Sequence, residues 1–258
     1  MRVHYEGCLL GVLAADRVAA RFEGQSRTSI MRRYSEGEDM AGAFEAGPPT
    51  AASVMTLAVA RSLGAFPDFN GDDMAARMLA SYRPGLGFGR ATERALERLR
   101  EGAEWDEAAA QKAGRSSFGN GAALRSAAVG LIGAGDAEDM RWTAEEASSI
   151  THQHALATEG ASIQAFAVAL ALASRGRELS ASGFLDMLAG ETPLREFRNR
   201  LEAAAGMSRT DTKATKIIER LGNGTTVDKD IPTQESTGAT NWSAISAGLA
   251  HTVALKSD

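Results

Sequence analysis

The stretch ASIQAFAVALALASRG, residues 161–176, is apolar on nearly every side. A helix on the surface of a protein shows a single apolar stripe, whereas a helix that is apolar all round is buried among other elements. The stretch therefore predicts a helix in the middle of a bundle. Its longest apolar run, residues 165–173, is well short of a membrane span.

Helical patterns continue on both sides of this stretch. TAASVMTLAVARSLG runs from a Thr50 cap to a stop at Gly64, and DAEDMRWTAEEASSITH starts at a cap on Asp136. FGRATERALERLREG is an ordinary amphipathic pattern, with Leu96 and Leu99 facing inward and its charges facing water. No alternating strand pattern competes with these signals before residue 233, so the sequence predicts an all-α fold.

Composition excludes several classes of protein. The chain has 258 residues, 44% of them hydrophobic, which is enough for a substantial core. Its net charge of −5 and the absence of a basic stripe argue against nucleic acid as a partner. The single cysteine, Cys8, excludes a disulfide framework and is expected to be a small buried hydrophobe. Without a signal-peptide pattern or a membrane span, the sequence predicts a soluble, cytoplasmic monomer.

A second stretch, RSSFGNGAALRSAAVGL at residues 115–131, suggests a ligand. Gly119 and Gly121 allow backbone angles that other residues avoid, so Ser117, Phe118 and Asn120 can lie on a tight loop. The loop leads into a helix start, where N–H groups and the helix dipole favour an anion such as phosphate. The aromatic side chain could stack on a base. These features indicate a nucleotide-like ligand, although a plain Gly-Asn-Gly turn fits the residues equally well.

The histidines suggest a further contact with this loop. His152 and His154 are two residues apart, so at helical spacing they point to different faces and a joint metal site is disfavoured. One of them facing the ligand loop is the better interpretation. His4 and His251 have no partners in the sequence and are expected on the surface.

Four motifs resemble those of one family, the ADP-ribosylglycohydrolases. RSSFGNGAALR resembles their Gly-Ser-Tyr/Phe-Gly-Asn-Gly-Ala-Met-Arg signature, and SSITHQHALATEGASIQAFAVALAL resembles a Thr-His segment followed by a Gly-Ala helix. GCLLGVLAADRVAARFEG is similar to the family's opening, and RLGNGTTVDKDIPT is similar to its Leu-Gly-Asn-Gly stretch. The motifs stand in the family's order and extend from residue 5 to about residue 233, which implies a helical domain over residues 1–233.

This resemblance implies a binding site for ADP-ribose or an ADP-ribosylated protein. The loop would cradle the diphosphate and its aromatic residue would pack on the adenine. His152 would approach a phosphate or a ribose, and Glu23 would lie at the reacting end as the catalytic residue. The implied binding residues are Ser117, Phe118, Gly119, Asn120, Gly121 and His152.

The resemblance also implies a metal cofactor, which the sequence does not support. The family holds two magnesium ions with a Thr-Asp-Asp-Thr helix start and a late Asp-x-Asp-Thr motif. Here the first motif reads Thr50-Ala51-Ala52-Ser53, and methyl groups cannot bind magnesium. Asp72 and Asp73 are expected to cap a helix rather than to replace these ligands.

The segment Thr210-Asp211-Thr212 is similar to part of the family's late motif. However, it stands before the Leu-Gly-Asn-Gly stretch, whereas the late motif follows that stretch. We therefore expect that Thr50 is left without its carboxylate neighbours and that magnesium is not bound. Three functions remain open at this point: a working hydrolase, an inactive ADP-ribose-binding module, and an incomplete domain without a function.

The last part of the chain predicts a different module. Residues 234–258, QESTGATNWSAISAGLAHTVALKSD, are rich in Ser, Thr and Gly, with Ile245, Val253 and Leu255 in short strand-like runs. They resemble one unit of the β-propeller repeats named for the regulator of chromosome condensation. The expectation is a C-terminally incomplete helical bundle followed by a short non-helical tail.

Overall fold

Every regular element that the computed structural model describes is a helix, which confirms the all-α prediction. The structure describes residues 2–20, 29, 32, 48–110, 117, 119–133, 135–174 and 179–209. The helices are α1 (Arg2–Ala19), α3 (Ala51–Ala65), α4 (Gly71–Ser81), α5 (Arg90–Arg100), α6 (Gly121–Arg125), α7 (Ala127–Ile132), α8 (Ala137–Ser149), α9 (Ala155–Ala173), α10 (Ala181–Glu191) and α11 (Arg195–Arg209). The tail, residues 234–258, lies outside the described residues.

Helix α9 occupies the centre of the bundle, as its apolar sequence predicts. It packs against α6, α7, α8 and α10. Within the described part of the chain, α9 is the one helix that is long and apolar enough to cross a membrane, and 67% of its apolar window is buried inside the protein. Neighbouring helices on several sides therefore cover the apolar side chains that α9 carries on nearly every face.

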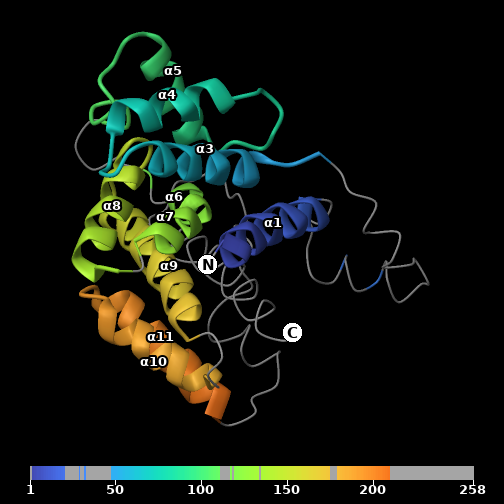
Figure 1. Ribbon diagram of the computed structural model, residues 1–258, viewed down its shortest axis with the longest axis vertical. Coiled ribbons are helices and arrows are strands. Elements are labelled where there is room, and N and C mark those ends of the chain that lie inside the picture. The colour runs from blue at the N-terminus through green and yellow to red at the C-terminus, as the bar shows by residue number, and fades with distance from the viewer. Residues whose placement is uncertain are drawn as a thin grey trace.

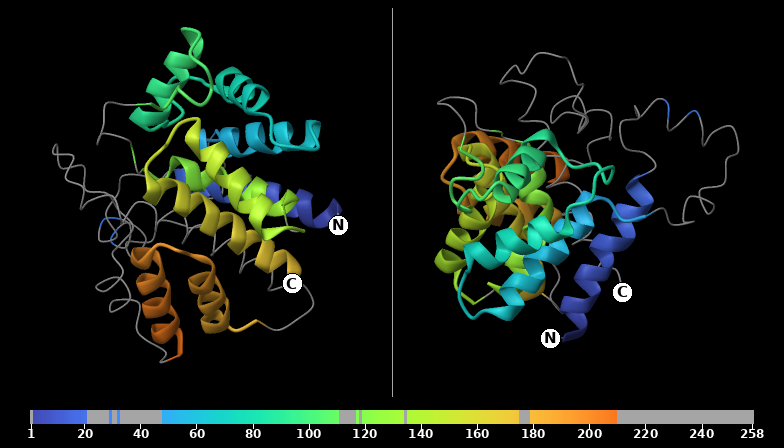
Figure 2. Two further views of the ribbon diagram at one scale, coloured as in Figure 1. Left: turned by 90° about the vertical axis from the view of Figure 1, so that its left-hand side faces the viewer. Right: turned by 90° about the horizontal axis from the view of Figure 1, so that it is seen from above.

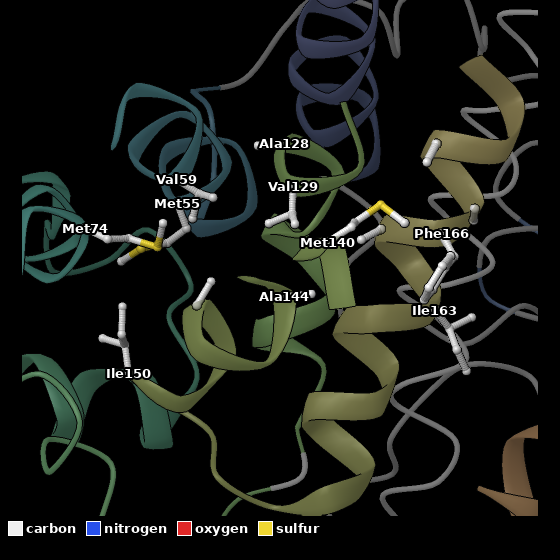
Figure 3. Packing of buried hydrophobic residues seen from close by; sticks show 14 of the residues in the cluster. Met55, Val59, Met74, Ala128, Val129, Met140, Ala144, Ile150, Ile163 and Phe166 are labelled. Atoms are coloured by element: carbon white, nitrogen blue, oxygen red, sulfur yellow. The ribbon is translucent and has the colours of Figure 1, made fainter. Parts of the chain in front are cut away.

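Five of the other helices form two groups on either side of the centre. Helices α3, α4 and α5 lie together at one end of the molecule, and α10 and α11 form a pair at the other end (Figures 1 and 2). Between α3 and α4, the side chains of Met55 and Met74 face one another in the main core (Figure 3). Helix α1 packs on α3 and α7 and buries Cys8 against Ala127 and Leu131, as expected for a small hydrophobe. Burial raises the pKa of the Cys8 thiol to about 11, so the thiol is neutral.

Helix starts agree with the cap residues in the sequence. The hydroxyl of Thr50 caps α3, and the Asp136 carboxylate accepts from the main-chain N–H groups of Glu138 and Asp139 at 2.8 and 3.1 Å. In α4 the expectation was wrong: the cap is Asn70, and Asp72 and Asp73 lie in the first turn, where Asp73 accepts from Ser62 and Arg77. Hydrogen bonds from Arg77 and Ser62 lower the pKa of Asp73. The Asp73 carboxylate therefore already accepts hydrogen bonds from Ser62 and Arg77, which disfavours it as a metal ligand.

One close contact fixes α7 on α9. A Cβ atom added to Gly130 would lie 2.2 Å from the main-chain oxygen of Ala165. No side chain could give way there, because the obstructing atom belongs to the backbone of α9. The glycine thus lets α7, and the short helix α6 before it, lie directly against the central helix.

Candidate functional site

A cavity of about 660 Å³ lies where the beginnings of α3, α5 and α6 meet. Its wall consists of Asp16 at the end of α1, residues 50–52 of α3, residues 87–92 and 94 around the start of α5, Ser117, residues 119–121, Arg125 and His152, together with Ala19, Ala20, Met55 and Leu124. The size falls in the range of ligand sites, which is about 300–1,000 Å³.

The described residues of the predicted ligand loop all line this cavity. Ser117, Gly119, Asn120 and Gly121 lie on its wall, and the Ser117 hydroxyl accepts from the Gly119 N–H at 3.2 Å. The Asn120 side chain makes no hydrogen bond to any other described residue, so its amide is available to a ligand. Phe118 and Glu23 lie outside the described residues. Their predicted roles stay predictions.

The reason for the glycine at position 121 differs from the one expected. Among the described glycines, positive φ angles occur at Gly85, Gly87 and Gly102, and the Gly-Asn-Gly loop is not among them. Instead, a Cβ atom on Gly121 would lie 2.9 Å from Cε1 of His152 and 3.3 Å from the Thr92 hydroxyl. Close approach to neighbouring side chains, rather than an unusual backbone angle, therefore requires glycine at this position.

The helix after the loop is also different from the prediction. Helix α6 has only 5 residues and ends at Ser126, whose ψ angle of −8° breaks the helical path before α7. A helix of little more than one turn has few aligned peptide units, so its dipole contributes little to anion binding. The anion site that the sequence predicts at this helix start stays a prediction.

His152 is buried beside the loop, with one ring nitrogen bound and the other close to the cavity wall. Its Nδ1 lies 2.7 Å from the Thr151 hydroxyl, and its Nε2 lies 3.3 Å from the Cβ position of Gly121. Burial, and then the charge of Arg125, lower the pKa of His152 to about 3, so the imidazole is neutral at physiological pH. The second histidine, His154, has another role: its Nδ1 accepts from the Leu156 N–H and caps α9.

The hydrogen bonds around Thr151 indicate which nitrogen of His152 carries the proton. The Thr151 hydroxyl accepts from an Arg125 Nη2 at 2.8 Å, so its own proton can be donated to Nδ1 of His152. We therefore assign the neutral tautomer with the proton on Nε2, the nitrogen on the side of Gly121. This N–H is suited to donate to an oxygen of a ligand.

Arg125 is the residue that holds this part of the wall together, and the sequence analysis does not single it out. The side chain is 1% exposed and donates to the main-chain oxygens of Gly121 and Ala147, at 2.9 and 2.8 Å, besides Thr151. These bonds connect the ligand loop with the end of α8 and with the residue before His152. Burial lowers the pKa of Arg125 to about 10, which leaves it charged at neutral pH. The arginine at the end of the RSSFGNGAALR motif was the signal that could have identified it.

The N–H groups at the start of α3 already donate to acceptors within the protein. Asp16 accepts from the hydroxyl and the main-chain N–H of Thr50 at 2.5 and 2.8 Å, and from the N–H of Ser53 at 3.4 Å. The N–H of Ala51 donates to the main-chain oxygen of Leu86 at 2.8 Å. Both oxygens of the Asp16 carboxylate are therefore used in capping the helix.

These residues do not fit a pair of magnesium ions. Ala51 and Ala52 line the cavity and have no side-chain oxygen, and the Asp16 carboxylate already accepts hydrogen bonds from Thr50 at the helix start. Over the described ranges, no group of three or more His, Cys, Asp or Glu side chains could hold a metal. Hard cations need several oxygen ligands at once, which this part of the wall does not supply.

Helix α5 contributes a wall that the sequence analysis misses. Its charges were expected to face water, and Leu96 is indeed buried. However, Arg90, Thr92 and Arg94 line the cavity, after a turn in which Gly87 has a φ of +78°. The ordinary amphipathic pattern of α5 conceals this role, because exposed arginines on a helix carry no sign of what they face.

Known proteins resemble this chain over most of its length. The family model for ADP-ribosylglycohydrolase matches residues 2–257. The chain is 33% identical over 200 residues to ADP-ribosylhydrolase ARH3 of Gallus gallus, covering 71% of this chain and 53% of that protein. It is 29% identical to the Xenopus tropicalis protein of the same name, covering 89% of this chain and 72% of that protein, and 28% identical to the Homo sapiens one, covering 89% and 71%.

The match to the family model includes residues 234–257, for which the sequence predicts a separate propeller-like tail. The comparisons give no support to the propeller resemblance, which stays a prediction. The chain spans about half the length of the Gallus gallus relative. With a family match over nearly its whole length and an all-helical fold, this chain belongs to the ADP-ribosylglycohydrolase family.

Proposed function

We propose that this chain binds ADP-ribose in the cavity and that its magnesium-dependent hydrolysis of ADP-ribosyl bonds is impaired or lost. One observation carries the proposal: a single cavity is lined by the Gly-Asn-Gly loop, by His152 and by the start of α3, where Ala51 and Ala52 stand in place of the family's carboxylates. The ligand is free ADP-ribose or the same group attached to a protein.

The chemistry of the wall supports an anionic, ribose-containing ligand. Asn120 offers an amide without a partner among the described residues, and His152 offers a neutral N–H. Arg90 and Arg94 bring positive charge to the cavity of a protein whose net charge is −5. Polar donors of this kind suit the hydroxyl groups and phosphate oxygens of ADP-ribose.

Hydrolysis is less well supported by the same wall. Cleavage at the ribose carbon needs a stabilised positive charge and an activated water molecule, and carboxylates or metal ions usually supply both. Among the described residues of the cavity wall, Asp16 is the one with a carboxylate, and both of its oxygens accept hydrogen bonds from the start of α3. The proposal therefore separates binding from turnover.

Calorimetry and a release assay test the two parts independently. We expect ADP-ribose to bind with an affinity that EDTA does not change, and to raise the melting temperature as any ligand of the folded state does. We expect no magnesium-stimulated release of ADP-ribose from modified serine or arginine peptides. Release that magnesium stimulates and EDTA abolishes would show a working hydrolase. Absence of both binding heat and a melting shift at millimolar ADP-ribose would refute the binding proposal.

A further inference from the structure

A second hollow, of about 350 Å³, lies at the far end of α3 from the ADP-ribose cavity. This hollow, the α3–α8 groove, is lined by residues of the segments 63–69, 129–133 and 135–143. Helix α3 has 15 residues, and a helix rises about 1.5 Å per residue, so the groove and the cavity are about 20 Å apart. The two share no described lining residue.

Exposed apolar side chains gather at this groove. Phe66 is 39% exposed, Ile132 46% and Trp142 51%, and they are three of the six large apolar side chains that are exposed in the described part of the chain. Val129 and Met140 also line the groove and belong to the main core (Figure 3). Single exposed apolar residues are ordinary, but three at one hollow indicate a surface that binds another molecule.

Trp142 is held in place although half of it is open to solvent. Its ring contacts the Phe69 ring edge to face, with the centroids 5.6 Å apart and the planes at 83°. The Phe69 ring in turn contacts Trp105, at 5.5 Å between centroids. A partner that binds to Trp142 therefore does not have to order a mobile side chain, and rigid aromatic residues contribute strongly to protein interfaces for this reason.

The rim of the groove is acidic. Asp68 follows α3, Asp136 and Asp139 lie at the start of α8, and all three are exposed. Asp136 caps α8 through Oδ1, whereas Asp68 and Asp139 form no ion pair with another residue of the described segments. Among the described residues that line the groove there is no lysine or arginine. Negative charge from two separate segments therefore borders an apolar floor.

An apolar floor with an acidic rim suits a partner that is both apolar and cationic. The rim attracts lysine and arginine, and the open face of a tryptophan ring also attracts a cation. An uncharged apolar partner would take the carboxylates out of water without a counter-charge, which is costly. A membrane surface is itself negative and would be repelled. The volume is at the lower end of the range for ligand sites, about 300–1,000 Å³, which fits one or two side chains of an extended segment.

We propose that the α3–α8 groove is a docking site for a short basic segment of another protein. A large apolar side chain of that segment fills the groove, and a neighbouring arginine or lysine binds to the Trp142 ring and to the carboxylates of Asp68 and Asp139. The site is separate from the ADP-ribose cavity, and the inference does not depend on the proposed function. A partner docked here would leave the cavity accessible.

Selection from a library of random seven-residue peptides on the full chain tests the inference. The enriched peptides should carry arginine or lysine next to a large apolar residue. The most enriched peptide is then synthesised, and its affinity for the wild type is measured by calorimetry at low and high salt. The affinity should fall as the salt concentration rises, because exposed charges are screened.

Substitutions in the groove should weaken binding of this peptide. Trp142→Ala and Ile132→Ser should each weaken it about tenfold or more, because each removes apolar contact area at the centre of the site. Asp68→Asn/Asp139→Asn should weaken it about threefold to tenfold, because exposed ion pairs contribute less. Asp136 is left unchanged because it caps α8. If Trp142→Ala unfolds through loss of its contact with Phe69, Ile132→Ser still tests the apolar floor.

Two control variants match these substitutions outside the groove. Met187→Ser removes an apolar side chain of α10 that is 50% exposed. Glu196→Gln/Glu202→Gln removes two exposed carboxylates of α11. Neither control should change the affinity, and melting temperatures show whether each variant is folded.

Several outcomes would overturn the inference. Enrichment of acidic or uncharged peptides, or of none, would exclude a basic segment as the partner. Unchanged affinity in Ile132→Ser and in Asp68→Asn/Asp139→Asn would place the peptide elsewhere on the protein. Equal weakening by Glu196→Gln/Glu202→Gln would reduce the effect to net charge. A dimer in sedimentation experiments that Ile132→Ser dissociates would assign the groove to a second copy of this chain.

Discussion

His152 shows how single residues in the cavity are controlled by their neighbours. Burial and the nearby charge of Arg125 keep its imidazole neutral, and the Thr151 hydroxyl determines which nitrogen faces the cavity. A cationic imidazole would attract phosphate more strongly, but it would also repel Arg125. The wall therefore uses a fixed, neutral donor at this point, with the positive charge carried by arginines.

Lowering the pH should destabilise the protein through His152. Its pKa is lowered from 6.5 to about 3, so between these values the unfolded chain binds a proton that the folded chain does not. The free energy of unfolding should fall as the pH falls below about 6.5, by at most about 1.4 kcal/mol per pH unit, and should not change through this group at higher pH. Urea unfolding of the wild type and of His152→Gln over about pH 4.5–7.5 measures the difference. Parallel curves for the two proteins would contradict the prediction.

Asn120→Ala should weaken ADP-ribose binding by about 1–3 kcal/mol, because a donor and an acceptor on the cavity wall are lost. Its side chain has no hydrogen bond within the described protein, so the melting temperature without ligand should stay nearly constant. Calorimetry and thermal unfolding give the two readouts. Asn199→Ala, at an exposed position of α11, is the control and should leave the affinity unchanged.

Individual helices were largely predictable, whereas the contacts between them were not. Caps at Thr50 and Asp136 are local signals, since a side chain binds the backbone two or three residues away, and both were correctly identified. The closed start of α3 depends on Asp16, which is 34 residues away from Thr50. The role of Arg90 and Arg94 likewise depends on segments that only the fold brings near α5. A periodic pattern in the sequence does not indicate which distant segments contact one another in the fold.

Gly130→Ala should destabilise the contact between α7 and α9. The added methyl carbon would lie 2.2 Å from the Ala165 oxygen, so the two helices must move apart, and overpacking of this kind costs about 1–3 kcal/mol or more. Gly190→Ala in α10 is the matched control, because nothing lies within 4 Å of its Cβ position. The control should be neutral or stabilising by about 0.5–1 kcal/mol. Denaturant unfolding compares them, and an equal effect of both substitutions would show that α7 does not press on α9.

At the scale of the whole molecule, the site depends on segments that are distant in the sequence. The cavity wall draws on α1, on the starts of α3 and α5, on the loop before α6 and on His152 before α9. The motifs singled out the loop and the histidine, and the structure places the described residues of both on one cavity. They gave no sign of the α5 wall, because its residues resemble those of any solvated helix.

Restoring two carboxylates should not restore a metal site. In Ala51→Asp/Ala52→Asp we expect no magnesium-stimulated release of ADP-ribose, since Asp16 stays bound to the start of α3 and the described wall offers no carboxylate besides it. The release assay and magnesium calorimetry on the double variant check this. Magnesium-dependent turnover by the double variant would show that ligands from the rest of the chain complete the site.

The central position of α9 has a consequence for the dynamics of the protein. Helix α9 packs against α6, α7, α8 and α10, so it cannot be exposed to water by the fraying of one neighbour. Its amide hydrogens, near Ile163 and Ala167, should exchange only when most of the bundle opens, and their exchange rates should report the free energy of global unfolding. The cavity wall, by contrast, consists of first turns and loops, which open at lower cost. A ligand in the cavity would then slow exchange in the wall strongly while slowing exchange in α9 only by as much as it stabilises the whole fold.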